Sequence, residues 1–348
     1  MAKQTENGKA FEYACALAIF NKYKNKQPIL FQESPQIQTA KNFYEAVTEN
    51  ERNNFNLAAN AAIKIIERFE PKLKDHDEEV PLILALQTDS QGEQGDVRDV
   101  LCIRKKNGWQ IGLSCKHNHH AVKHSRLSST IDFGEEWFNK KCSKTYFDEV
   151  VPIFDELRLM RDESKKTKLW KEIDNKAEKY YIPVLQAFMK ELQRLDKKFP
   201  KEIPELLIRY LIGRYDFYKV ITNDTGRFTR VEVVNIVGTL NTPSKKYKPV
   251  VRVPLLKMPT EFYHIGFKEG SSNTIIVACD NGWNVSMRLH NASSKVEPSL
   301  KFDVNLIALP NSVYATDEYW DEVEDASYTC NEAISYMAAE ESSLDFSK

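Results

Sequence analysis

The sequence lacks the motifs of several large enzyme classes. It contains no GxxxxGK[ST] phosphate-binding loop, no GxGxxG fingerprint after a strand and no GxSxG elbow. These absences argue against P-loop nucleotide hydrolases, Rossmann dehydrogenases and α/β-hydrolases. No apolar run approaches the about 18 residues that would cross a bilayer, and no charged-then-apolar leader opens the chain. We therefore expect neither secretion nor membrane insertion.

Cysteine and net charge are also sparse. The six cysteines form no CxxC pair: Cys15, Cys102, Cys115, Cys142, Cys279 and Cys330. This scatter favours reduced thiols in a cytoplasmic protein. The net charge of −1 over 348 residues points to no particular partner. With 42% hydrophobic and 28% charged residues, the composition is that of an ordinary globular protein, either one large domain or two closely packed ones.

The charges are nevertheless distributed unevenly. Asp96 and Asp99 precede a stretch, 100–131, that has no Asp or Glu but holds six Lys/Arg and four of the seven histidines. A few acids followed by a purely basic stretch suit a metal-dependent phosphodiesterase. In such an enzyme the acids hold a divalent cation and the bases contact a polyanion. The end of the chain, 317–348, is largely acidic and is expected to be a peripheral tail.

The apolar spacing predicts an α/β protein. Helices are predicted at 11–21, 40–69, 147–161, 169–199 (with a break at Pro183) and 205–212. Strands are predicted at 82–86, 100–104, 109–115, 217–222, 230–237, 265–267, 274–278, 284–290 and 301–306, while 28–32 fits a strand or a loop. Most of the predicted strands therefore follow a helical middle region.

Asn107-Gly108 lies between two apolar runs and predicts a β-hairpin. With these two residues as the turn, Asp99 would lie opposite Lys116 and Leu101 opposite Ser114. Because side chains alternate along a strand, Asp99, Ser114 and Lys116 would share one face. A bulge would change this register.

An acid and a lysine at the end of a hairpin suit phosphodiester hydrolysis. Asp99 can ligate Mg²⁺, and Lys116 can orient or activate the attacking water and offset charge in the transition state. One carboxylate rarely holds Mg²⁺ alone, so Asp96 and Glu12 are further candidates; the small and apolar neighbours of Glu12 indicate that it points inward. The plainer alternative is a surface hairpin with a cross-strand ion pair.

The basic continuation of the hairpin is a candidate for DNA contacts. If the chain turns from strand to helix there, side chains can reach phosphates, and the candidates are His117, His119, Lys123, His124 and Arg126. A solvated basic loop is the alternative. A zinc site built from Cys115 and the histidines 117, 119, 120 and 124 is a further option, but the spacing fits no standard site and lacks a distant second ligand pair.

Longer strings resemble a known family. Asp99-x14-Ser114-Cys115-Lys116 resembles the PD-(D/E)XK nuclease motif. Five longer strings resemble type II restriction endonucleases of the HaeIII family: SCKHNHHAVKHSRLS, IDFGEEWFNKKCS, YLIGRYDFYKV, NIVGTLN and RLHNASSKVEPSLKFDVNLIALP. These strings extend over nearly the whole chain and are more specific than the short motif.

The resemblance implies a restriction-endonuclease-like core, a mixed central sheet flanked by helices, with helical and β-rich additions. We expect the core at 1–135, a helical region at 136–215 and a β-rich DNA-recognition part at 216–316, with one compact domain as an alternative. The resemblance also implies Mg²⁺-dependent cleavage of double-stranded DNA at GGCC with blunt ends, and a companion methyltransferase. Because palindromic sites favour symmetric dimers, a homodimer is an option.

Carried over residue by residue, the resemblance makes Asp99 the metal-binding acid and Lys116 the catalytic lysine. Ser114 departs from the motif, which has Asp or Glu there, and Arg98 stands where the motif has proline. The missing carboxylate is expected to come from Glu12 first and from Asp96 second.

A second donor-rich segment lies near the C-terminus. Its candidate DNA-contacting residues are Arg288, His290, Asn291, Ser293 and Lys295. Arginine reads guanine O6 and N7, and a GGCC target offers guanines on both strands. The alternative is a polar β-turn whose side chains face solvent.

Two other functions remain open at this point. One is a nuclease of the same fold that acts in repair or recombination without a strict palindromic target. The other is a catalytically inactive DNA-binding protein, which Ser114 would favour.

Overall fold

The computed structural model describes residues 2–75, 80–88, 96–117, 123–162 and 168–320, and the chain forms two compact units. Unit 1 contains residues 1–119, 215–256 and 312–348, and unit 2 contains residues 120–214 and 257–311. The predicted core region 1–135 and the predicted β-rich region 216–316 each contribute to both units. Unit 1 is therefore completed by strands that come much later in the sequence.

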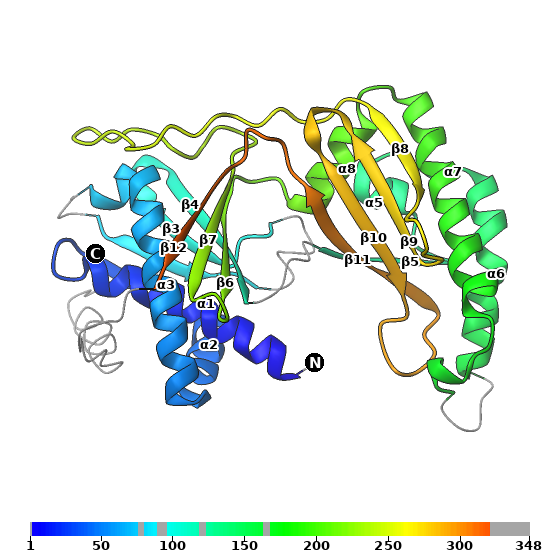
Figure 1. The fold of residues 1–348 in the computed structure, drawn as a ribbon, viewed down its shortest axis with the longest axis horizontal. Helices are drawn as coiled ribbons and strands as arrows, with labels where there is room; N and C mark the ends of the chain where they lie inside the picture. The colour runs from blue at the N-terminus through cyan, green and yellow to red at the C-terminus, as the bar shows by residue number, and fades with distance from the viewer. Residues whose placement is uncertain (1, 76–79, 89–95, 118–122, 163–167, 321–348) are drawn as a thin grey trace, which may run out of the picture. The chain divides into compact units, whose positions relative to one another are not determined.

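Unit 1 is built on a seven-stranded mixed sheet in the order β1-β2-β3-β4-β6-β7-β12 (Figure 1). The strands are β1 (Ile29–Phe31), β2 (Leu82–Leu86), β3 (Val100–Arg104), β4 (Trp109–His117), β6 (Phe217–Asn223), β7 (Phe228–Val234) and β12 (Tyr314–Tyr319). β2, β3 and β4 form an antiparallel meander, while β6 runs parallel to β4. A mixed sheet flanked by helices, as the sequence predicts, is confirmed.

Helices α1 (Ala2–Tyr23), α2 (Pro35–Ala46) and α3 (Glu49–Phe69) belong to unit 1. Alternate residues of the central strands, including Val100, Leu113 and Val220, share one buried core with α1 and α3. The prediction of a single helix over 40–69 is wrong. The helix is interrupted at Thr48, which caps the start of α3. Thr48 forms a capping box with Glu51, in which each side chain accepts a hydrogen bond from the other residue's backbone N–H.

The hairpin exists, but its predicted register is wrong by two residues. Arg104 pairs with Trp109, so the turn has four residues: a 3-10 turn (Lys105–Asn107) followed by Gly108 in the left-handed conformation at φ 62°. Val100 pairs with Leu113, which places Asp99 opposite Ser114 and not opposite Lys116. Because the shift is even, the residues on each face are unchanged.

Unit 2 contains an antiparallel sheet in the order β5-β11-β10-β9-β8. Its strands are β5 (Lys123–Ser128), β8 (Phe262–Phe267), β9 (Thr274–Cys279), β10 (Asn284–His290) and β11 (Ser299–Ala308). The strand-to-helix continuation considered for the segment after His117 is wrong where the chain is described, because 123–128 extends the sheet by pairing with β11.

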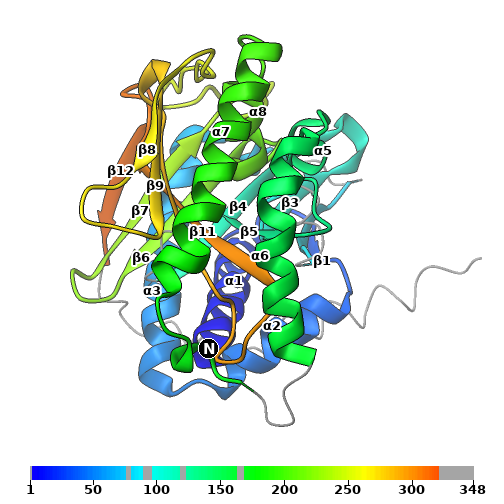
Figure 2. The same ribbon diagram turned by 90° about the vertical axis from the view of Figure 1, so that its right-hand side faces the viewer.

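The helices of unit 2 are α5 (Phe133–Phe138), α6 (Lys144–Asp162), α7 (Ile182–Lys198) and α8 (Ile203–Ile212); a π-helical turn (Ala177–Tyr181) leads into α7, and Pro183 lies in its first turn. α6 and α7 lie side by side (Figure 2). Phe302 of β11 contacts Phe188 of α7 at 5.2 Å and Trp137 of α5 at 6.3 Å between ring centroids. Aromatic packing thus covers one face of this sheet.

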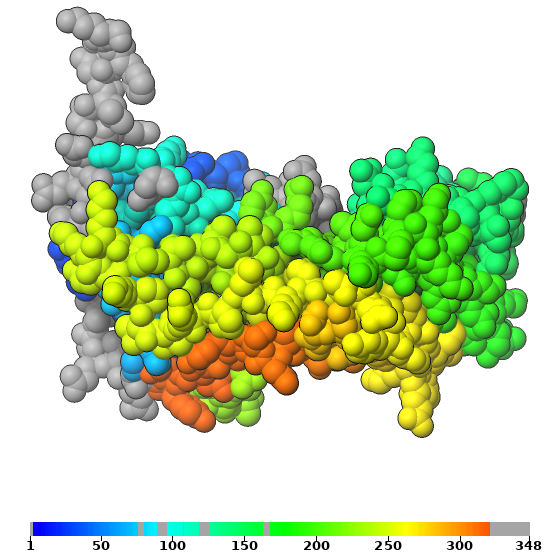
Figure 3. Space-filling view, turned by 90° about the horizontal axis from the view of Figure 1, so that it is seen from above, coloured from blue at the N-terminus to red at the C-terminus, as the bar shows by residue number. Residues whose placement is uncertain are grey.

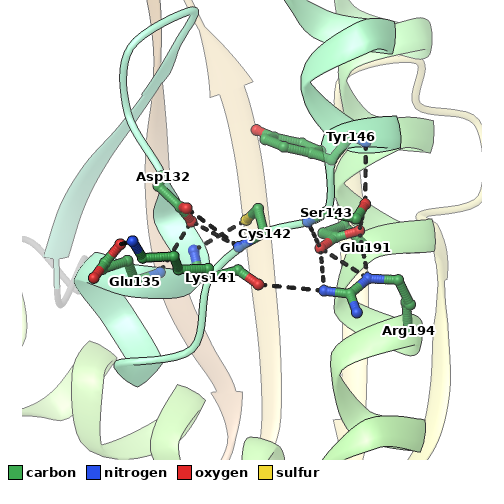
Figure 4. A network of polar contacts seen from close by, with 9 residues as sticks. Asp132, Glu135, Lys141, Cys142, Ser143, Tyr146, Glu191 and Arg194 are labelled. Carbon is green, nitrogen blue, oxygen red and sulfur yellow. Dashed lines mark hydrogen bonds and ion pairs between the residues drawn. The ribbon is translucent and has the colours of Figure 1, made fainter.

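A polar network fixes the loop between α5 and α6 (Figure 4). Asp132 caps α5 through Glu135 N–H and also accepts the Cys142 N–H. The buried Glu191 of α7 accepts hydrogen bonds from Ser143 N–H and Oγ–H at 2.6 and 2.7 Å, and Arg194 neutralises its charge at 2.7 Å. The loop therefore replaces water as the partner of these carboxylates.

Asp216 fixes the segment that follows β7 in unit 1. Its carboxylate accepts N–H groups of Ile236, Val237 and Thr239 at 2.5, 2.7 and 2.6 Å. These bonds explain why β7 ends at Val234 and not at 237 as predicted: the amides that would extend the strand bind Asp216. Residues 235–256 then run at the surface of unit 1, where they are yellow-green in Figure 3.

The predicted peripheral tail begins too early. Residues up to Tyr319 form β12, which pairs with β7, and Arg230 forms an ion pair with Asp317 at 2.7 Å. Trp320 is buried, and its indole N–H bonds Thr229 Oγ1 at 2.9 Å. Residues 321–348, including Cys330, lie outside the described residues.

The five described cysteines are free thiols, in agreement with the sequence. In the part of the chain that the structure describes, no helix combines the length and apolar character needed to cross a bilayer.

Candidate active site

Asp99 and Lys116 lie together in unit 1, where β3 begins and β4 ends. The Lys116 Nζ is 3.6 Å from Asp99 Oδ2, and the same oxygen accepts the Cys115 N–H at 2.6 Å. Each side chain keeps about a fifth of its surface exposed, 21% for Asp99 and 23% for Lys116. The pair is therefore positioned by backbone geometry and remains accessible to a substrate.

The pKa of Lys116 is raised by its surroundings. Burial alone would lower it, but the adjacent Asp99 carboxylate outweighs that effect. Lys116 is consequently an ammonium group at neutral pH. It can stabilise negative charge on a phosphoryl group without first acquiring a proton.

Glu12 of α1 points inward, as its apolar neighbours predict. It is 6% exposed, and Lys9 Nζ lies 3.1 Å from its Oε2. Burial, and next the repulsion of Asp99, raises the pKa of Glu12 to about 8. Two carboxylates that disfavour each other's charge form a site that a divalent cation would stabilise, because the cation neutralises both. The donors are hard oxygens, which fit Mg²⁺.

Asp96 is less suited to hold a metal. Arg98 donates to both of its oxygens at 2.7 Å, and Gln87 Nε2 donates to Oδ2 at 2.8 Å. These bonds outweigh burial and lower the pKa of Asp96. Because Arg98 bonds both of its oxygens, Asp96 would have to give up these bonds to ligate a cation. Asp96 instead holds Arg98, whose guanidinium stacks 4.1 Å from the Tyr215 ring centroid.

Ser114, which stands in place of the motif acid, has charged neighbours that sequence reasoning missed. Across the sheet Ser114 pairs with Lys219, and Lys219 pairs with Glu232. Lys219 Nζ lies 3.5 Å from Glu232 Oε2, and both are largely buried. Burial lowers the pKa of Lys219, Glu232 raises it and Lys116 lowers it further. The available signal was a charged residue between apolar neighbours, Lys219 in β6 and Glu232 in β7.

The candidate DNA-contacting residues that follow the hairpin differ in their exposure and contacts. His117 Nε2 contacts Asp224 Oδ2 at 2.9 Å, and its ring packs edge-on against Phe55. His119 lies outside the described residues, as do the side chains of Lys123 and His124, whose backbone belongs to β5. Arg126 is exposed on β5 and donates to Ser299 Oγ at 3.0 Å.

The sheet of unit 2 brings two distant predicted segments together. Arg126 pairs with Lys301, which pairs with His290, so that three basic residues lie in one row across β5, β11 and β10. In the next row Arg288 pairs with Asp303 and bonds it at 2.6 Å while staying 57% exposed. We call the residues Arg126, Lys301, His290 and Arg288 the basic face of unit 2.

The turn that follows β10 is held by its own side chains. Asn291 Nδ2 donates to the carbonyls of Ser293 and Lys295, both at 2.6 Å, and its Oδ1 accepts the Glu297 N–H. Ser293 Oγ also bonds within the turn. A polar turn is present, but Asn291 is buried and does not face solvent as that alternative expects, whereas the Lys295 side chain is exposed.

The zinc alternative gains no support in the described residues. Cys115 hydrogen-bonds Cys15, and this bond together with burial raises the pKa of its thiol, so the thiolate that zinc requires is disfavoured. Among the residues that the structure describes, no group of three or more His, Cys, Asp or Glu is placed to hold a metal ion. A cation held by Asp99 and Glu12 would therefore need further oxygens from water or substrate.

Comparison with known proteins gives two matches. A family model described as HaeIII restriction endonuclease matches residues 8–310. The type II restriction enzyme HaeIII of Haemophilus aegyptius is 38% identical over 320 residues, which cover 92% of this chain and 99% of that enzyme. No solved structure matches the chain.

A substitution at Gly112 tests how tightly the chain before Asp99 is packed. A Cβ at this position would lie 2.1 Å from Arg98 Cδ and 2.8 Å from Arg98 Cβ, so the Arg98 side chain would have to move from its root. We expect Gly112→Ala to lower the free energy of unfolding by about 1–3 kcal/mol, measured by urea denaturation. Gly8→Ala is the matched control: it meets no atom within 4 Å on helix α1, and about 0.5–1 kcal/mol of stabilisation is expected. Equal stability of the Gly112 variant and the wild type would contradict this packing.

Proposed function

The chain belongs to the HaeIII restriction endonuclease family, and we propose that it cuts double-stranded DNA at GGCC, leaving blunt ends, with Mg²⁺ held by Asp99 and Glu12. Family membership makes it a type II site-specific deoxyribonuclease of a restriction–modification system. The observation that carries the proposed site is the 3.6 Å contact of Asp99 and Lys116 at adjoining strand ends, with the buried Glu12 beside them.

A PD-(D/E)XK core is part of the proposal. It is supported by the meander β2–β4, by β6 running parallel to β4, and by an acid at the start of β3 paired with a lysine at the end of β4. The departure at Ser114 removes one carboxylate from this pattern. Glu12, which comes from α1, is our candidate for the missing charge.

Each residue of the site has a distinct proposed role. The Cys115 N–H orients Asp99, whose charge interacts with Glu12, and the two acids are proposed to bind the same cation. Bound there, Mg²⁺ would polarise the scissile phosphate and acidify the attacking water. The Lys116 ammonium stabilises the negative charge that develops on the phosphoryl oxygens and orients the water. Lys219, paired with Glu232, adds a second buried cation near Lys116.

The basic face of unit 2 is proposed to contact DNA. Its residues are partly or largely exposed, and lysine, histidine and arginine supply donors for phosphates and base edges. Arg288 is our candidate for reading guanine, since its guanidinium is 57% exposed. A symmetric dimer would match a palindromic target. A partner methyltransferase and a cytoplasmic location, where the host DNA lies, complete the proposal.

Sequencing the fragment ends of a digested plasmid tests the proposed GGCC target. With Mg²⁺ we expect discrete fragments whose ends, when sequenced, fall in the middle of GGCC and carry no overhang. A smear, or cutting only at junctions, would favour the repair-type nuclease. The absence of any Mg²⁺-stimulated hydrolysis would favour the inactive DNA-binding protein.

Asp99→Asn and Lys116→Met should each abolish detectable cleavage, since one removes a cation ligand and the other the charge facing the phosphate. Binding of a GGCC duplex, measured by fluorescence anisotropy, should change little. Lys144 and Asp148 are the matched controls: they form an exposed ion pair at 2.8 Å on α6, so Asp148→Asn and Lys144→Met should cleave like the wild type. Full cleavage by the Asp99 or Lys116 variants would refute the assigned roles.

The raised pKa of Glu12 predicts how pH affects cation binding. Below its pKa of about 8, protons compete with the cation for Glu12, so affinity should rise with pH and level off above that value. Calorimetric titration should give about a tenfold gain in affinity per pH unit below the plateau. Glu12→Gln should weaken binding and flatten this slope, whereas Glu45→Gln, a partly exposed acid on α2, should leave it unchanged. An unaltered slope in Glu12→Gln would exclude Glu12 as a ligand.

A further inference from the structure

A segment of unit 1 that follows β7 carries an excess of positive charge. Residues 235–261 form neither helix nor strand, and no Asp or Glu occurs from 233 to 260. Within unit 1 this acid-free stretch holds four cations, all exposed: Lys245, Lys246, Lys248 and Arg252. We call residues 241–252 the basic arm, and they belong to the yellow-green surface segment of Figure 3. The proposed catalytic roles use none of these residues.

The base of the basic arm is fixed by Asn241. Its backbone is in the left-handed conformation at φ 59°, which asparagine tolerates better than most residues. Its Nδ2 donates to the carbonyls of Phe69 and Val251 at 3.1 and 2.8 Å, and its Oδ1 accepts the Val253 N–H at 2.9 Å. Its own N–H donates to the buried Glu70 at 2.7 Å. One residue therefore joins both ends of the arm to the end of α3.

The middle of the basic arm is also ordered by hydrogen bonds. Ser244 Oγ accepts the N–H groups of Lys246 and Tyr247 at 3.2 and 2.9 Å, which forms a turn at the tip. The Val250 N–H donates to the Arg68 carbonyl of α3 at 2.8 Å. The backbone is thus held in place while the four cationic side chains are exposed. Because the loop is already ordered, binding a ligand would cost little backbone entropy.

The four cations of the basic arm form no ion pair with a carboxylate among the described residues. The basic face of unit 2 differs, because Arg288 and His290 lie 2.6 and 3.1 Å from Asp303. Like charges that are held close together without compensation favour a partner with closely spaced negative charge. Duplex DNA has one phosphate charge per about 1.7 Å of its axis. A DNA backbone is therefore a suitable partner for the arm.

The basic arm leaves the sheet away from the catalytic pair. β7 ends at Val234, which pairs with Phe217, whereas Lys116 pairs with Ile221, four residues further along β6. At about 3.3 Å per residue, these two levels are about 13 Å apart along the strands. The proposed target reaches only two base pairs, about 7 Å, to either side of the cut. We therefore expect the arm to face DNA outside the four base pairs of GGCC.

We propose that the basic arm binds the sugar-phosphate backbone of duplex DNA that flanks the recognition sequence, through its four cations and without regard to base sequence. The inference rests on the proposed function, because it takes double-stranded DNA as the ligand. The arm makes binding tighter on long DNA than on a duplex that barely exceeds the target, and this gain depends strongly on salt.

The test removes charge from the tip of the basic arm and compares the effect with an equal loss of charge elsewhere. The arm variant replaces the three lysines of the tip: Lys245→Gln, Lys246→Gln and Lys248→Gln. The control variant replaces three exposed lysines on α1, α6 and α7: Lys3→Gln, Lys144→Gln and Lys190→Gln. The two variants have the same net charge, and urea denaturation checks that each remains as stable as the wild type.

Dissociation constants are measured against salt concentration for duplexes of about 10 and about 30 base pairs, both centred on GGCC, with Ca²⁺ in place of Mg²⁺. A gel checks that the DNA remains intact. On the longer duplex the arm variant should bind more weakly, and the slope of log K against log salt should become shallower by about 0.9 for each lysine that contacts a phosphate. On the shorter duplex it should match the wild type, and the control variant should match the wild type on both. Equal slopes for the two variants on the longer duplex, or an equal loss on both duplexes, would overturn the proposal.

Two further measurements separate the basic arm from the active site and from a contact between copies of the chain. Single-turnover cleavage of the shorter duplex at saturating protein should be as fast in the arm variant as in the wild type, because the arm does not contact the scissile phosphate. A slower rate would place the arm in the active site and contradict the proposal. Sedimentation without DNA should give the same mass for both proteins, and a smaller assembly in the arm variant would make the arm a protein interface instead.

Wild-type cleavage distinguishes failure of this inference from failure of the proposed function. If the wild type cuts at GGCC while the arm variant binds both duplexes like the control variant, only the role of the basic arm is lost. If the wild type does not cut duplex DNA with Mg²⁺, the proposed function itself is wrong.

Discussion

Two carboxylates that repel each other, Asp99 and Glu12, are the constraint on which the proposed active site depends. Burial of Glu12 is the larger effect and the repulsion of Asp99 adds to it, and together they raise the pKa of Glu12 to about 8. A lysine ammonium lies within 4 Å of each acid, Lys9 of Glu12 and Lys116 of Asp99. Such an arrangement favours a divalent cation because the cation neutralises both acids at once, and this links the energetics of the fold to a metal-dependent chemistry.

The chain before β3 is also tightly packed. Asp99 must enter the sheet at a fixed point, and Arg98, Asp96 and Gln87 fix it through short hydrogen bonds. Gly112 has no side chain, and the Arg98 side chain occupies the space that a Cβ would take. Because Arg98 bonds both oxygens of Asp96, we propose that the second acid of the site comes from another element, as Glu12 of α1.

The two units use a sheet in the same way but present different chemistry. Each buries one face of its sheet under helices and leaves polar residues on the other. In unit 1 those residues include acids next to lysines, and in unit 2 they include four basic residues, of which Arg288 and His290 both contact Asp303. The proposed function assigns catalysis to unit 1 and DNA contact to unit 2, so variants in the two units test separate parts of the proposal.

The sequence by itself determined the family, most of the helices and strands, and the shared face of Asp99, Ser114 and Lys116, because alternation along a strand survives a register error of two residues. It did not determine the four-residue turn, the break at Thr48 or the strands β5 and β12, which depend on capping and on distant partners. Only the tertiary structure showed that Arg98 and Gln87 bond Asp96, that Glu12 is buried, and that Lys219 lies beside Glu232. The reason is physical: a hydrogen-bond partner, unlike a hydrophobic period, can come from any part of the chain, and burial is set by all the elements that pack around a side chain.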